Sequence, residues 1–256
     1  MGKAFKDRTG EEKYNRIGSL MRIIKYRNSR DIDVYFPEYN WTFKHSNYMS
    51  FEKGSVKCPY EPRCCGKGYC GEGIYETNYN GKDAKCYHTW YNMLTRCYSE
   101  EYHSNKPTYI DCEVCEEWLC YQTFAEWFYE NYYEVKGECM NLDKDILYKG
   151  NKIYSPDTCV FVPQYINSLF DTNINIRGEY PIGVRYDKRR NKFSAQANDK
   201  NDKQIFLGYY DNPEDAFYAY KQFKESLIKE VADDYINDIP HILYESMYNY
   251  EVEIDD

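Results

Sequence analysis

The sequence has no long hydrophobic run, and no stretch approaches the roughly 18 to 20 apolar residues that a membrane-spanning helix needs. The first residues, MGKAFKDRTGEEK, lack the apolar segment of a secretory signal. Histidine is scarce, with 4 residues, and the glycine-rich segment GKGYCG lacks the spacing of a dinucleotide fingerprint. These absences predict a cytoplasmic protein that has no membrane partner.

Aromatic residues are abundant, with 31 Tyr, 12 Phe and 4 Trp among 256 residues. Rings fill small cores while tyrosine hydroxyls reach the surface, so the chain can form several small modules. The 11 Cys of an intracellular protein are expected to be reduced thiols or metal ligands rather than a disulfide framework.

The net charge of -9 argues against nucleic-acid binding if it is averaged over the chain. Residues 232–256, however, contain eight acidic side chains and no Lys or Arg, and account for nearly the whole imbalance. A polyanion responds to the local field, so the average is a poor guide. The block 81–170 stays acidic, with 14 acidic and 8 basic residues, which counts against DNA binding there.

The pattern of short strands and amphipathic helices predicts an α+β protein of several modules. Residues 1–80 form a small β-rich domain, and residues 81–172 form a central domain in which two helices flank a pair of short strands. Residues 173–232 form a three-stranded antiparallel sheet packed on one helix, and residues 233–256 form an acidic tail with a short helix in HILYESMY.

Three strand-like runs, YPIGVRY, KFSAQAN and QIFLGYY, precede a helix that starts at Asn212 and Pro213, a typical cap and first helical residue. Strand alternation directs one set of side chains to the helix: Val184, Tyr186, Phe193, Ala195, Ala197, Ile205 and Leu207. The opposite face carries long polar side chains that suit base edges and phosphates, although an ordinary solvated face is the alternative. The predicted DNA-binding residues are Arg185, Arg189, Arg190, Lys192, Ser194, Gln196 and Asn198.

Acidic and amide groups are dense in the central stretch LDKDILYKGNKIYSPDTCVFVPQYIN. Asp143 and Asp145 offer the hard oxygen donors that Mg²⁺ or Mn²⁺ prefers, or else they cap a hairpin. Nearby thiols could hold a structural Zn²⁺ in a tetrahedral site, or they are buried core residues. The candidate zinc ligands are Cys97, Cys112, Cys115 and Cys159.

The segment GVRYDKRRNKFSAQA…IFLGYYDNPEDAFYAYKQFKE resembles the APETALA-type (ethylene-response-factor) DNA-binding domain. The shared features are the GVR start, the K-aromatic-x-A strand, LG-aromatic and the capped helix. The resemblance covers roughly a fifth of the chain and implies that the sheet face contacts double-stranded DNA. Asp187 stands where the plant domains carry a second Arg, which implies a lower affinity.

The central block resembles phage and prophage HNH homing endonucleases through HTWYNMLTRCYS, YIDCEVCEEWLCYQTFAEWF, LDKDI and NKIYSPDTCVFVPQYIN. The resemblance implies an HNH-like ββα core in which Asp143 and Asp145 ligate the metal, Asn151 orients the hairpin and Asn167 completes the site. It also supports Cys97, Cys115 and Cys159 as zinc ligands. Lys144 occupies the position of the expected general-base His, and a lysine is protonated near pH 7, so it is a poor base.

These observations predict a phage-type DNA-binding protein in the host cytoplasm whose HNH-like hairpin nicks DNA weakly or not at all. One alternative is an interaction module that reuses a decayed nuclease, such as an inhibitor of a basic host defence protein, with the acidic surface as a DNA mimic. Another alternative is a transcription regulator, which would use the same sheet.

Overall fold

The computed structural model describes residues 6–79, 81–170 and 179–255. Contacts divide the chain into two compact units, Met1–Glu130 and Asn131–Asp256. Helices and strands are mixed in both units, which confirms the α+β prediction. The boundary between the units lies inside the predicted central domain, and the predicted boundary at 172/173 lies outside the described residues. No helix in the described ranges is long and apolar enough to cross a membrane.

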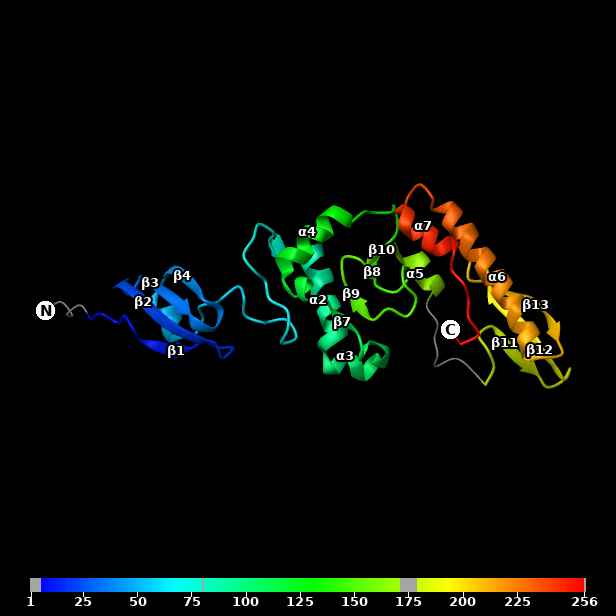
Figure 1. The fold of residues 1–256 in the computed structure, drawn as a ribbon, viewed down its shortest axis with the longest axis horizontal. Helices are drawn as coiled ribbons and strands as arrows, with labels where there is room; N and C mark the ends of the chain where they lie inside the picture. The colour runs from blue at the N-terminus through cyan, green and yellow to red at the C-terminus, as the bar shows by residue number, and fades with distance from the viewer. Residues whose placement is uncertain (1–5, 80, 171–178, 256) are drawn as a thin grey trace. The chain divides into compact units, whose positions relative to one another are not determined.

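The N-terminal module is a four-stranded antiparallel sheet in the order β1-β2-β3-β4, drawn in blue in Figure 1. Its strands are β1 (Glu12–Tyr14), β2 (Leu20–Asn28), β3 (Asp31–Phe36) and β4 (Trp41–Ser46), and they are followed by helix α1 (Tyr48–Glu52). The core beneath the sheet consists of Met21, Ile23, Ile32, Val34, Phe36, Phe51, Val56 and Cys58. Alternating apolar residues in β2 and β3 therefore produce the β-rich module that the sequence predicts.

The rest of the first unit is mainly helical. It contains the short hairpin β5 (Asn78–Tyr79) and β6 (Lys82–Asp83), helices α2 (Lys85–Tyr98), α3 (Glu100–Asn105) and α4 (Tyr121–Asn131), and the short strand β7 (Glu113–Val114). Aromatic rings fill its core: the Trp90 indole Nε1 donates to the carbonyl of Trp118 at 2.7 Å, and the Trp90 and Tyr121 rings lie 5.5 Å apart. The abundance of aromatic residues thus serves small cores here.

The second unit begins with the central hairpin. Strand β8 (Met140–Asp143) pairs antiparallel with β10 (Val160–Pro163), and β9 (Ile153–Tyr154) lies in the connection between them. Helix α5 (Gln164–Phe170) follows β10 directly. This is the pair of strands and the helix predicted for the central block, with a connection that holds Lys144 to Cys159.

The C-terminal sheet contains β11 (Val184–Asp187), β12 (Lys192–Asn198) and β13 (Gln204–Tyr210) in that order, all antiparallel. Helix α6 (Pro213–Asp234) lies across one face, as Figure 1 shows in orange and yellow. The Asn212 side chain caps α6 by accepting the backbone N–H of Asp215 at 2.7 Å. Gly183, at φ +76, lies so close to α6 that a Cβ there would stand 2.1 Å from the Tyr220 ring. The predicted arrangement of sheet and helix is confirmed.

Helix α6 is longer than the sheet, and its second half belongs to another core. Leu227, Ile228, Val231 and Ala232 pack with residues of the central hairpin, of α5, of helix α7 (His241–Tyr248) and of the turn before it: Ile146, Val160, Val162, Ile166, Ile239, Leu243 and Met247. Val252 is buried against the C-terminal sheet. Residues 239–252 are therefore part of the folded unit: α7 is the short helix predicted in HILYESMY, and the apolar residues of this segment pack on α6 and on the C-terminal sheet.

Candidate nucleic-acid interface

Strand alternation assigns the two faces of the C-terminal sheet correctly for most positions. Val184, Ala195 and Ala197 are buried against α6, where small residues on β12 let the helix approach. Arg185 and Asn198 are exposed, and Arg185 faces Ser194 across the strand pair. Helix α6 packs on the opposite face through Ala216, Phe217 and Tyr220.

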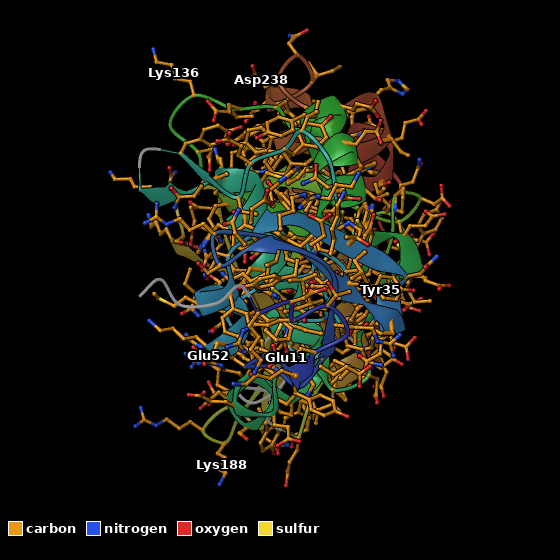
Figure 2. All side chains as sticks on the ribbon, turned by 90° about the vertical axis from the view of Figure 1, so that its left-hand side faces the viewer. Glu11, Tyr35, Glu52, Lys136, Lys188 and Asp238 are labelled. Atoms are coloured by element: carbon orange, nitrogen blue, oxygen red, sulfur yellow. The ribbon has the colours of Figure 1, made fainter. Side chains whose placement is uncertain are left out.

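Basic side chains concentrate on β11, β12 and the turn between them. Arg185 and Arg189 are exposed, and Lys192 is 43 % exposed while its amine lies 2.9 Å from an Asp211 carboxylate oxygen. Lys188, in the same turn, points away from the molecule in Figure 2. The positive charge of this edge therefore lies at the surface, where phosphates can reach it.

The amide and hydroxyl groups predicted to read DNA differ in their availability. Ser194 is only 6 % exposed, and its hydroxyl donates to the Arg185 carbonyl at 3.2 Å, so this group supports the sheet. Gln196 lies on the middle strand, and its amide oxygen is buried with no hydrogen-bond partner among the described residues. A buried polar atom without a partner costs free energy, so the Gln196 side chain gains if it turns towards a donor on a ligand.

Two aromatic residues on the outer face are not among the DNA-binding residues predicted from the sequence. Phe206 is 52 % exposed and Tyr209 is 38 % exposed, and their rings lie 4.8 Å apart. An irregularity in the pairing, where Ala195 faces Gly208 but Gln196 faces Phe206, shifts the alternation of β13 by one residue. Tyr209 therefore faces outward beside Ser194, although strict alternation directs it to α6. The glycine in LGYY, which adopts φ +144, is the sequence signal for such a bulge.

Asp187 ends β11 and organises the turn. Its Oδ1 accepts the backbone N–H groups of Arg189 at 2.9 Å and Arg190 at 3.3 Å. Its Oδ2 accepts a hydrogen bond from Arg190 Nη1 at 3.2 Å, and the Arg190 guanidinium lies 4.8 Å from the centre of the Tyr209 ring. The acidic residue is thus a turn-capping group that also contacts a cation.

In the central hairpin, the Asp143 carboxylate is used by its own backbone. Its Oδ1 accepts the N–H groups of Asp145 at 2.9 Å and Ile146 at 2.7 Å. Burial, together with the neighbouring charge of Asp145, raises the pKa of Asp143 to about 6. Asp143 therefore caps the turn. Of its two predicted roles, metal ligand and cap of the hairpin, these contacts match the second.

Lys144 is 6 % exposed, and its amine donates to Asp145 Oδ2 at 2.9 Å. Asn151 closes the turn by donating from Nδ2 to the carbonyls of Lys144 and Ile153, both at 2.7 Å. Asn167 lies half-buried on α5. The turn thus brings together Asp143, Lys144, Asp145 and Asn151. A divalent ion bound by both carboxylates would compete with the Lys144 amine, so this donor set fits such an ion poorly.

The candidate zinc ligands are divided between the units. Cys97, Cys112 and Cys115 belong to the first unit, and Cys159 belongs to the second. Burial raises the pKa of Cys159 to about 12, so this thiol is protonated unless a metal displaces the proton. Zinc binding by these cysteines stays a prediction.

Within the described ranges, one group brings metal-type ligand atoms within 4.8 Å of one another: Asp31, Asp33 and His45 on the N-terminal sheet. Arg27 contacts both carboxylates, at 3.0 Å for Asp31 and 2.8 Å for Asp33. Its hydrogen bond holds the pKa of Asp33 at about 2. The Arg27 guanidinium thus partly neutralises the carboxylates of Asp31 and Asp33, in the place where a metal ion would otherwise do so.

Comparison with protein-family models matches residues 180–230 to the AP2 domain. The match spans β11–β13 and most of α6, and it supports a C-terminal DNA-binding domain and DNA as a partner. No curated protein and no solved structure matches the chain.

Proposed function

We propose that the protein binds double-stranded DNA in the major groove through the outer face of β11–β13. The observation that carries this proposal is the composition of that face, where exposed Arg185, partly exposed Lys192 and exposed Phe206 stand on three adjacent strands. The major groove admits a narrow β-sheet and displays the acceptors and methyl groups that such side chains recognise.

The contacts of this face divide into two classes. Lys188 and Arg189 lie in the turn at the edge of the sheet, and we assign them to phosphates, which position the protein. Arg185 and Gln196 lie within the sheet, and we assign them to base edges, which give specificity. A transcription regulator and a mobile-element protein would use this face in the same way.

Binding is tested with a pool of randomised duplexes at about 50 mM salt, where phosphate contacts are strongest. The wild type is expected to retain duplexes, and Arg185→Ala is expected to weaken binding about tenfold or more. Arg22→Ala, which removes an exposed arginine paired with Glu12 on the N-terminal sheet, is the matched control and should bind as the wild type does. Failure of the wild type to retain any duplex would contradict the proposal.

We propose further that the central hairpin derives from an HNH nuclease of a phage or prophage and no longer cleaves efficiently. Two features support the loss of activity. The amine of Lys144 donates a hydrogen bond to the Asp145 carboxylate, and the Asp143 carboxylate accepts hydrogen bonds from two backbone N–H groups. A buried ammonium is a poor general base, and the Lys144 amine competes with a divalent ion for Asp145.

Plasmid nicking with Mg²⁺ or Mn²⁺ tests this second proposal. The wild type is expected to nick no faster than Asp143→Ala. Robust nicking by the wild type that Asp143→Ala abolishes would refute the proposal. The variant Lys144→His tests whether the general base is the one missing group. Metal-dependent nicking by this variant would indicate that the rest of the nuclease site is intact.

An acidic hollow in the first unit favours a second function, binding of a basic protein. Its volume is about 340 Å³, and Tyr60, Tyr69, Glu72, Glu116 and Glu117 line it. Aromatic faces and carboxylates together suit a lysine or arginine side chain. Charge reversal by Glu116→Lys and Glu117→Lys should abolish capture of a basic partner and leave DNA retention intact. Capture that is unchanged would remove this candidate.

A further inference from the structure

We infer that Arg190 is a DNA contact and that Asp187 and Tyr209 hold its guanidinium in place over the outer face. The inference rests on the proposed DNA binding and assigns roles within that site. The guanidinium would donate to a pair of adjacent acceptors on DNA, either phosphate oxygens or the O6 and N7 of a guanine.

The first support is the geometry around the guanidinium. Asp187 Oδ2 lies 3.2 Å from Nη1, and the Tyr209 ring centre lies 4.8 Å from the guanidinium carbon. A carboxylate at one end and a ring face beneath restrict a long side chain that otherwise loses rotamer entropy when it is ordered. Part of the conformational entropy that the Arg190 side chain would lose on binding DNA is thus already lost in the free protein.

The second support is that the guanidinium remains available. The Arg190 side chain is 59 % exposed, and Nη1 is the nitrogen that donates to Asp187. A guanidinium has five N–H donors, so Nη2 and Nε can still form a bidentate pair with a ligand. Arg189, the neighbouring residue, uses its backbone N–H to contact Asp187 and has its side chain exposed.

The third support is the fold itself, because the bulge in β13 is what brings Tyr209 to this face. The pairing of Tyr209 with Ser194 directs its ring outward, beside the buried Ser194. With strict alternation the ring would face α6, and the Arg190 guanidinium would have no aromatic support. The acidic Asp187 is then a positioning residue within a basic face.

Binding of a selected duplex tests the roles through a double-mutant cycle. Arg190→Ala should weaken binding about tenfold, whereas Arg22→Ala, the matched control on the N-terminal sheet, should leave it unchanged. Asp187→Asn keeps the turn cap and removes the charge. It should weaken binding about threefold in the wild type, and this loss should vanish in the Arg190→Ala background. Tyr209→Ala should behave in the same way, and Tyr209→Phe, which keeps the ring but removes the hydroxyl that hydrogen-bonds Asp187, should retain most of the binding.

The sign of the Asp187→Asn effect is decisive. If the carboxylate only repels phosphates, the variant binds more tightly, and the inference is overturned. Equal affinities for Arg190→Ala and the Arg22→Ala control overturn it as well. A wild type that does not bind DNA refutes the proposed function, whereas binding that is insensitive to Arg190→Ala refutes this inference alone.

Two further measurements identify the acceptor. A phosphate contact predicts that Arg190→Ala lowers the slope of log affinity against log salt by about one, uniformly across sequences. A guanine contact predicts loss of discrimination at one base pair with the slope nearly unchanged. Either result supports the contact, and a variant that changes neither property excludes it.

Discussion

The outer face of the C-terminal sheet and the turn of the central hairpin are both rich in charged side chains. In the sheet these side chains are exposed to solvent, whereas in the hairpin they are bound by other groups of the protein. Arg185 and Arg189 of the sheet edge are exposed, whereas in the hairpin Lys144 is buried against Asp145 and Asp143 is bound by backbone N–H groups. Charged groups can serve a ligand only where the fold leaves their hydrogen-bonding capacity available. A dense set of acidic and amide residues is therefore a weak indicator of a site until the partners are known.

The two regions also share a helix, which makes them energetically dependent. The first half of α6 covers the sheet and its second half packs on the hairpin, while Phe223 and Tyr250 contact both cores. The proposed DNA-binding face is thus supported by the central hairpin. This packing gives the hairpin a structural role, for which no base or metal is needed.

The largest effect is expected from breaking this shared support. Ile228→Ala removes a fully buried side chain of α6 and should lower the free energy of unfolding by about 2–5 kcal/mol. Because both cores depend on α6, sheet and hairpin should unfold in one transition in urea. Ile236→Ala, at a residue that is 51 % exposed, should change stability by less than about 0.5 kcal/mol. Two separate transitions would show that the regions are independent.

The next effect concerns the buried carboxyl of the hairpin. The folded pKa of Asp143, about 6, lies above the ordinary value of 3.8, so the folded protein holds this proton more tightly. The protonated carboxyl therefore contributes to the free energy of unfolding. This contribution is fully present below pH 3.8 and is lost as the pH rises through 6. Asp143→Asn should therefore stabilise the protein by about 1–2 kcal/mol at pH 7 and by almost nothing near pH 4.

The matched control for that prediction is Asp145→Asn. This variant removes the carboxylate that accepts the buried Lys144 amine, so its effect at pH 7 should have the opposite sign. Urea unfolding at pH 4 and pH 7 measures all three proteins. A loss of stability for Asp143→Asn at pH 7 would indicate that the ionised carboxylate is favoured by its surroundings.

A smaller effect is expected on the open face. Phe206→Ala should weaken DNA binding about three- to tenfold, because an exposed aromatic side chain can contact thymine methyl groups. Its stability should change by less than about 0.5 kcal/mol, since the ring is 52 % exposed. Thermal melting and fluorescence anisotropy separate the two effects. A large loss of stability with unchanged DNA affinity would assign Phe206 to packing.

The smallest effect is expected at the turn between β11 and β12. Lys188→Ala should leave base preference unchanged and should lower the slope of log affinity against log salt by about one, because we assign Lys188 to a phosphate. Titrations at several salt concentrations measure the slope. An altered base preference would instead place Lys188 in the groove.

The sequence predicts the regular parts of this molecule well. Alternation in YPIGVRY and KFSAQAN assigns the two faces of β11 and β12, and Asn212-Pro213 marks the start of α6. It fails where tertiary context decides. The bulge that turns Tyr209 outward breaks the two-residue period, and the burial of Ser194 follows from its neighbours. The acidic composition of residues 233–256 also obscures apolar positions that join a core with α6 and with Val160 and Val162, which lie far away in sequence.

Hydrogen–deuterium exchange with and without a selected duplex tests the contrast between the two regions most directly. The open face predicts that DNA slows exchange in β11–β13 and in the turn at residues 188–191, while residues 140–163 exchange at unchanged rates. Protection confined to residues 140–163 would contradict the account, because the hairpin would then be the surface that meets DNA.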